Sequence, residues 1–264
     1  MDFTRIKQLV VPEGVVKKIE IGGQSIWQSE PEEMNGPFTA AQSAAIRAGD
    51  FTDVPVGYAW TFEDVPYTYV DANNATQSST YSGTMRVADC DYYLGTGDVE
   101  CTTHHVVVVP DESMYVAKMN QYNTNITGYV GSQMRTVYLR RAEAIFKACF
   151  GESHVLKHRE YLVKKVSNGK ETEGAWYDST VELMDERMVY STITTGTNES
   201  LPSVSNRLLS LFKNNSNLVK IKAWWWLRNV SESQYFLVVS ATSGTRQKTF
   251  ASTSYGVRPY ALIY

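Results

Sequence analysis

The sequence predicts an α+β fold in which a small N-terminal β-hairpin unit precedes a larger, mixed but β-rich domain. Three observations support this fold class. The chain has 264 residues, which is enough for one large domain. It contains 17 tyrosines and 6 tryptophans, and aromatic residues favour strands. Several short apolar runs are separated by turn residues, whereas only one long segment has a clear helical period.

Residues 15–28 have the pattern of a β-hairpin. Ile19 and Ile21 alternate with charged residues, and Gly22 and Gly23 can adopt the positive φ angles of a tight turn before the strand pattern resumes. A lone two-stranded hairpin is only marginally stable in water. We therefore expect this hairpin to pack on its own domain or on a neighbouring chain.

A polar connector divides the chain. Residues 31–37 read PEEMNGP, and polar stretches that contain Pro and Gly are typical of loops. We predict an attachment or oligomerisation unit over residues 1–30, a linker over 31–37 and one α+β domain over 38–264.

The larger domain is predicted to open with a short helix over residues 39–50. Thr39 and Gln42 form a capping box at its start, and Gly49 is a suitable C′ residue at its end. Four consecutive valines at 106–109 indicate a strand that is buried on both faces. The strand patterns in this region cover residues 56–62, 83–95 and 104–110.

The longest helix is predicted over residues 132–150. Its apolar residues recur at spacings of three and four, and Gly151 follows its end. A shorter helix is expected near residues 206–215, while residues 179–190 fit either a helix or a strand. The remaining strand patterns cover residues 224–230, 234–241 and 256–264.

The composition argues against several classes of partner. The net charge is −3, so we expect no binding to nucleic acid. No apolar run approaches the roughly 20 residues of a membrane span, and the N-terminus lacks the features of a signal peptide. We expect synthesis in a cytoplasm and no membrane insertion. The 3 cysteines are scattered and odd in number, so a disulfide framework is not expected.

No motif predicts catalysis. His104 and His105 are adjacent, and neighbours on a strand point to opposite faces, so strand geometry does not bring them onto one metal ion. His154 and His158 have helical spacing but lack the glutamate of a zinc-protease motif. Nucleotide-binding glycine loops and a nucleophile elbow are also missing. We expect no enzymatic activity, no cofactor and no bound metal.

The segment 224–264 has stiff ends. Alternate residues of a strand share one face, so Trp224 and Trp226 are expected opposite Trp225, with Arg228 on their side. Tyr255 and Arg258 are expected nearby, with a guanidinium stacked on an aromatic ring, and Gly256 permits a close approach of two backbones. The residues predicted as framework are Trp224, Trp226, Arg228, Tyr255, Gly256 and Arg258.

Between these ends, residues 229–253 are mostly small, polar or aromatic. Residues of these types form adaptable recognition surfaces. An ordinary solvated loop has the same composition, so both interpretations remain open on this pattern alone.

The closing pattern WWLR…YGVRP carries a resemblance to a known family, together with the upstream segments RVADCDYYLGTGD, HHVVVVPD, MNQYNT and GAWYDSTVELMDERMVY. Over residues 38–264 the chain resembles a large family of phage and phage-derived proteins of Gram-positive bacteria. Its opening, MDFTRIKQLVVPEG, is similar to N-termini of tail-region proteins in such phages. The closing module also resembles the C-type-lectin-like fold, which displays variable ligand-binding surfaces in proteins of diversity-generating retroelements.

The resemblance implies a phage tail or baseplate adhesin, located in the virion, that recognises a host cell-surface protein or glycan. Residues 1–30 would attach to other tail proteins, and a homotrimer is expected by analogy with phage receptor-binding proteins. The alternative is a structural virion protein, for head decoration or tail assembly, with no host ligand. The implied ligand-binding residues are Asn229, Ser231, Glu232, Ser233, Tyr235, Ser240, Thr242, Thr245, Arg246, Lys248, Phe250 and Thr253.

Overall fold

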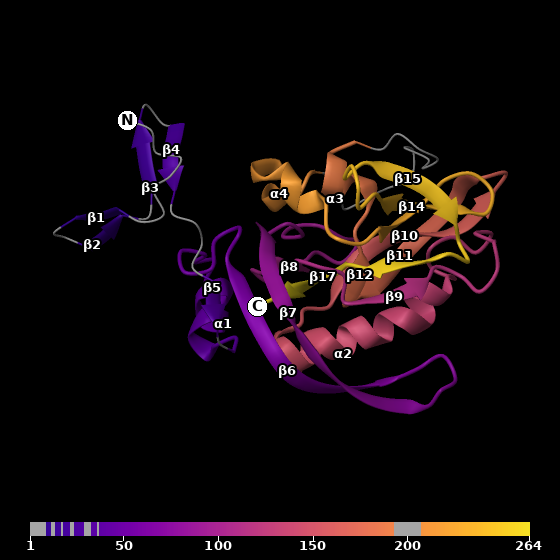
Figure 1. Cartoon of the computed structure of the whole chain (residues 1–264), viewed down its shortest axis with the longest axis horizontal. Coiled ribbons are helices and arrows are strands. Elements are labelled where there is room, and N and C mark those ends of the chain that lie inside the picture. The colour runs from indigo at the N-terminus through magenta and orange to yellow at the C-terminus, as the bar shows by residue number, and fades with distance from the viewer. Residues whose placement is uncertain are drawn as a thin grey trace. The chain divides into compact units, whose positions relative to one another are not determined.

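The computed structural model describes residues 37–192 and 207–264 with their side chains, and the backbone of five short strands among the first 36 residues. Contacts along the backbone divide the chain into two units, Met1–Glu33 and Met34–Tyr264. The fold is α+β and rich in strands, as the sequence predicts (Figure 1). Among the described residues, no helix is long and apolar enough to cross a membrane.

The N-terminal unit holds two antiparallel hairpins. β3 (Lys18–Ile21) pairs with β4 (Gln24–Gln28), which confirms the predicted hairpin, although the turn predicted at Gly22 and Gly23 lies outside the described residues. β1 (Leu9–Val11) pairs with β2 (Gly14–Val16). The sequence analysis missed this second hairpin because a strand of three residues is too short to show an alternating pattern.

The larger unit contains a six-stranded sheet in the order β12-β17-β8-β7-β6-β5. Its short edge strand β5 (Glu33–Asn35) lies within the segment that we predicted as a linker. β8 is buried along its whole length, as the run of valines predicts. The other members are β6 (Ala59–Val70), β7 (Thr76–Cys90), β8 (Val106–Pro110), β12 (Val181–Leu183) and β17 (Pro259–Ile263).

A five-stranded sheet has the order β15-β14-β13-β16-β9. β13 and β16 run parallel, and the other neighbours run antiparallel. β15 was not predicted, because its sequence RQKTF lacks the apolar alternation of a half-buried strand. The members are β9 (Tyr115–Lys118), β13 (Trp225–Val230), β14 (Tyr235–Val239), β15 (Arg246–Phe250) and β16 (Ser254–Val257).

The two longer predicted helices are present. α1 (Ala40–Arg47) begins with the predicted capping box, in which Thr39 and Gln42 exchange hydrogen bonds of 3.1 and 3.2 Å. The helix predicted over 132–150 begins as a π-helical turn, η1 (Met134–Tyr138), and continues as α2 (Leu139–Phe150). Gly151 follows it with a φ of 89°, which suits a glycine after a helix.

The ambiguous segment 179–190 is both strand and helix. β12 passes into α3 (Glu186–Tyr190), which Asp185 caps by accepting a hydrogen bond from the Met188 amide. The helix predicted near residues 206–215 is shorter than expected. The observed helix, α4, covers Ser210–Asn214. The remaining elements are a hairpin of β10 (His158–Ser167) and β11 (Lys170–Ser179) and the 3₁₀ turns η2 (Glu152–His154) and η3 (Ser216–Val219).

Two hydrophobic clusters fill the domain. The first contains the inward face of α2 and the side chains of Val106, Val108 and Ile263. The second contains apolar residues of α3 and α4 together with Val107 and Val109. Adjacent residues of β8 thus point into different clusters. Figure 1 accordingly shows α2 on one side of the six-stranded sheet and α3 and α4 on the other.

Candidate functional site

β14 and β15 form one edge of the five-stranded sheet and carry an aromatic pair that reaches the surface. Tyr235 of β14 lies opposite Phe250 of β15, and their rings stack with centroids 4.6 Å apart. Phe250 is 42% exposed. Lys248 lies over the Tyr235 ring at 5.6 Å and pairs with Glu232 at 2.7 Å, which raises the pKa of its ammonium group. An aromatic stack with a paired charge beside it therefore stands at the surface.

The loop that follows β9 lies beside this pair. The side-chain amide of Asn125 donates to the backbone carbonyls of Glu232 (2.6 Å) and Tyr235 (3.2 Å). The Ser252 amide donates to the side chain of Asn123 at 3.1 Å. These hydrogen bonds join the loop to the start of β14 and to the residues that follow β15, which lie at the same end of the ribbon, so the two segments form one surface.

The same loop exposes two large apolar side chains, Tyr122 (75% exposed) and Ile126 (68% exposed). The sequence analysis missed both, although bulky residues within the polar stretch NQYNTNIT were a usable signal. We call the combined surface the display face, and define it as the exposed parts of Tyr122, Ile126, Glu232, Tyr235, Lys248 and Phe250.

Most of the predicted ligand-binding residues reach the surface. Arg246 is half-buried because its guanidinium pairs with the buried Glu186 at 2.8 Å and lies over the Tyr190 ring. Tyr235 and Thr253 are also half-buried. The exposed members are Glu232, Ser233, Thr242, Thr245, Lys248 and Phe250.

Three predicted ligand-binding residues are buried, and for these the prediction was wrong. The Asn229 side chain accepts a hydrogen bond from the Glu186 amide at 2.7 Å. The Ser240 hydroxyl accepts from the amides of Thr242 and Ser243. The Ser231 amide donates to the Tyr235 carbonyl at 3.0 Å. Each is at most 5% exposed and offers no surface to a ligand. Asn229 lies within β13 and contacts the start of α3, whereas Ser231 and Ser240 lie in the turns at the two ends of β14.

The framework prediction holds for the tryptophans. Tyr255 packs against Trp224 and Trp226 with ring centroids 5.9 and 5.4 Å away. Trp225 points to the opposite face and belongs to the other hydrophobic cluster. Gly256 lies beside β13, with its amide 2.8 Å from the Trp224 carbonyl, so the close backbone approach is also confirmed.

Arg258 is part of the frame but lies on the other side from the one predicted. Its guanidinium stacks on Trp225 at 5.1 Å and on Phe212 at 5.5 Å, and donates to the Pro110 carbonyl at 2.8 Å. Burial lowers the pKa of Arg258 to about 10. The predicted stacking of a guanidinium on an aromatic ring is therefore present, and the ring is that of Trp225.

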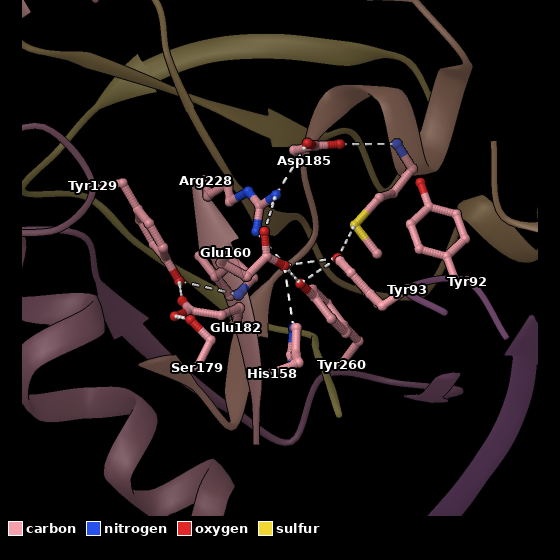
Figure 2. A network of polar contacts seen from close by, with 12 residues as sticks. Tyr92, Tyr93, Tyr129, His158, Glu160, Ser179, Glu182, Asp185, Arg228 and Tyr260 are labelled. Carbon is pink, nitrogen blue, oxygen red and sulfur yellow. Dashed lines mark hydrogen bonds and ion pairs between the residues drawn. The ribbon is translucent and has the colours of Figure 1, made fainter. Parts of the chain in front are cut away.

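Arg228 lies in a buried polar cluster (Figure 2). Its Nη2 atom is 3.3 Å from Glu160 and 3.2 Å from Asp185. Glu160 also accepts hydrogen bonds from the hydroxyls of Tyr93 and Tyr260. The cluster joins β10, β13, β17 and the N-terminus of α3. Strand alternation predicts Arg228 on the side of Trp224 and Trp226, but it gives no sign of these partners, which are distant in sequence.

The cluster keeps Glu160 ionised inside the domain. Burial opposes the charge, but Arg228 and the hydrogen bonds from His158 and Tyr260 outweigh it and lower the pKa of Glu160 to about 2. Burial, followed by the negative charge of Glu160, raises the pKa of both Tyr93 and Tyr260. All of these side chains are buried, so the cluster fits a structural role inside the domain.

Within residues 37–192 and 207–264, no group of three or more His, Cys, Asp or Glu side chains could hold a metal ion. A search of protein-family models, of curated proteins and of solved structures found no match to this chain.

Proposed function

We propose that the chain is a phage virion adhesin that binds a host cell-surface protein or glycan through the display face. The observation that carries this proposal is the Tyr235–Phe250 stack, which lies at the surface next to the loop that exposes Tyr122 and Ile126. Exposed apolar side chains that gather in one place mark interaction sites more often than scattered ones do.

The physical basis of recognition would be a small number of rigid anchors. Tyr and Phe offer a large contact area with few rotatable bonds, so binding costs them little conformational entropy. Polar side chains such as Glu232 and Lys248 surround the stack and can set specificity at its rim. In this proposal the protein binds its target and does not catalyse a reaction.

The support beneath the display face agrees with a variable surface on a C-type-lectin-like module. Phe236 and Val238 of β14, which follow Tyr235, are fully buried. The Trp226 indole donates to the Ala117 carbonyl at 2.9 Å and ties β13 to β9. Substitutions at Glu232, Lys248 or Phe250 would leave these contacts in place, which is the property that a diversified surface needs.

Assembly is the second part of the proposal. Residues 1–30 would attach the chain to other tail proteins, and the adhesin would act as a homotrimer. Several display faces on one virion would raise the overall affinity by effective concentration even if each site binds weakly.

The test is adsorption of virions to the strain in which the phage is propagated. Virions that carry Tyr235→Ala or Phe250→Ala should adsorb at least about tenfold more slowly, because hot-spot aromatics contribute 2 kcal/mol or more. Val99→Ala is the control, since Val99 is 67% exposed and lies outside the display face. Normal adsorption of both aromatic variants would rule out this function for the face.

The alternative is a structural virion protein with no host ligand, in which the same apolar side chains contact another virion protein. The exposure of the aliphatic side chain of Ile126 favours this structural role as a second candidate function. In that case Phe250→Ala and Ile126→Ala would reduce the yield of assembled particles, and the particles that do assemble would adsorb normally.

A further inference from the structure

A recessed pocket lies at the opposite edge of the five-stranded sheet from the display face. The display face uses β15, whereas this pocket borders β9, the other edge strand. Its walls come from the turn between β6 and β7, from β9 and β16, and from the junction of η1 and α2. The volume is about 390 Å³, and the lining includes Tyr69, Asn73, Tyr115, Lys118, Arg141 and Ser254.

Arg141 is held in this pocket by three tyrosines. Its guanidinium lies 4.8 Å from the ring centre of Tyr115, 5.3 Å from Tyr69 and 5.9 Å from Tyr67. Its Nε atom donates to the Tyr67 hydroxyl at 2.9 Å. Because three rings surround the Arg141 side chain, it is restricted to one orientation. Ligand binding would therefore cost it little conformational entropy.

Two positive charges in the lining have no counter-ion in the part of the chain that the structure describes. Among the described residues, the terminal Nη atoms of Arg141 and the Nζ atom of Lys118 have no hydrogen-bond or ion-pair partner. Asp71 is the carboxylate of the lining, but its oxygens accept from the amides of Asn73 and Ala75 and from the Gln77 side chain within its own turn. The pocket therefore offers unused donors and net positive charge.

The geometry points to this pocket as a binding site for an acidic saccharide, with the ligand carboxylate held by Arg141 and Lys118. A guanidinium presents paired N–H donors that match a carboxylate in a bidentate arrangement. The remaining lining suits a sugar ring, because the Asn73 amide and the Ser254 hydroxyl can bond to its hydroxyls while Tyr138 offers an aromatic surface. The volume lies in the range of small-molecule sites and accommodates one hexuronic acid unit.

The test is an NMR titration of the full chain, labelled with ¹⁵N, at fixed ionic strength. D-glucuronate is the probe, D-glucose tests the need for the carboxylate, and inorganic phosphate tests the need for the sugar. D-glucuronate should shift amide signals of residues 69–73, 115–118 and 254 in a saturable manner, and neither control should do so at the same concentration.

Variants assign the binding to the two cations. Arg141→Gln should weaken D-glucuronate binding about tenfold or more, because the charge-assisted hydrogen bonds to the ligand carboxylate are lost. Lys118→Gln should weaken it several-fold. Arg140→Gln is the matched control, since Arg140 is the neighbouring residue of α2 and is exposed; it should bind as the wild type does.

Arg141 also fixes the β6–β7 hairpin, so Arg141→Gln can lower the melting temperature for structural reasons. Lys118 has no such contact, and its variant therefore separates binding from folding. Three results would overturn the proposal: no saturable shift with D-glucuronate, equal binding of inorganic phosphate, or unchanged binding by Lys118→Gln and Arg141→Gln. None of them bears on adsorption by the Phe250 variant, so this inference and the proposed function fail separately.

Discussion

The Nη2 atom of Arg228 lies 3.3 Å from the Oε2 atom of Glu160, and both side chains are buried within the larger domain. Removing two ions from water has a high desolvation cost, which is offset only when each ion keeps its partners. The pair also connects β13, which borders the ribbon that carries the display face, to β10. Its loss should therefore reduce both the stability of the domain and the order of the display face.

Arg228→Met should lower the free energy of unfolding by about 3–5 kcal/mol, because it leaves Glu160 and Asp185 charged and buried without their cation. Urea denaturation measures the change. Arg140→Met, on the exposed side of α2, should change it by less than about 0.5 kcal/mol. A loss below about 1 kcal/mol for Arg228→Met would mean that the pair contributes little.

Stability should fall steeply in acid because of Glu160. Its pKa is lowered from 4.5 to about 2 in the folded state, so the unfolded chain takes up the proton first. The contribution is present above pH 4.5 and is lost as the pH falls towards 2, by up to about 3 kcal/mol.

Urea midpoints measured at several values of pH test this assignment. Glu160→Gln should flatten the acid limb of the stability curve, whatever its effect at neutral pH. The exposed Glu63 provides the control, and Glu63→Gln should retain the wild-type slope. Equal slopes for both variants would assign the acid sensitivity to other groups.

Gly256→Ala should destabilise the domain by about 1–3 kcal/mol through overpacking. A Cβ atom at this position would meet the Ser113 side chain, with the Ser113 Cβ only 2.7 Å away, and the Trp224 carbonyl at 3.0 Å. Removing the neighbour in the double variant Ser113→Gly/Gly256→Ala should recover part of the loss relative to Ser113→Gly alone. Thermal melting of the four proteins provides the comparison, and no recovery would place the clash at the backbone carbonyl of Trp224.

Neighbouring residues of β14 should respond differently to truncation. Phe236 is fully buried, so Phe236→Ala should cost about 3–5 kcal/mol. Tyr235→Ala, one residue earlier, should cost less than about 1 kcal/mol because its ring stacks at the surface. Similar losses for both variants in urea denaturation would mean that the Tyr235–Phe250 stack is part of the core.

Local signals in the sequence predicted local structure well. The capping box of Thr39 and Gln42 and the valines of β8 depend on residues that are close together in the chain. Strand alternation also placed Trp224 and Trp226 correctly on one face. These features could be read because their cause is contained in a short stretch of residues.

Features that depend on distant partners could not be read in the same way. Asn229, Ser231 and Ser240 have the composition of a solvated loop, and only the packing of α3 and of the β14 turns buries them. Glu160 and Asp185 gave no sign that they would meet Arg228. β15 was missed because an exposed edge strand does not need the apolar alternation that identifies a strand in a sequence.

The position of β17 has a consequence for how the protein is made. β17 lies inside the six-stranded sheet, between β8 and β12, where Ile263 pairs with Val106 and Ala261 with Val181. During synthesis, one edge of β8 therefore stays unpaired until the ribosome has added residues 259–263. Pairings over such long sequence separations form slowly, and an unpaired apolar strand edge promotes aggregation. The yield of folded protein should therefore depend on how well this edge of β8 is protected during synthesis.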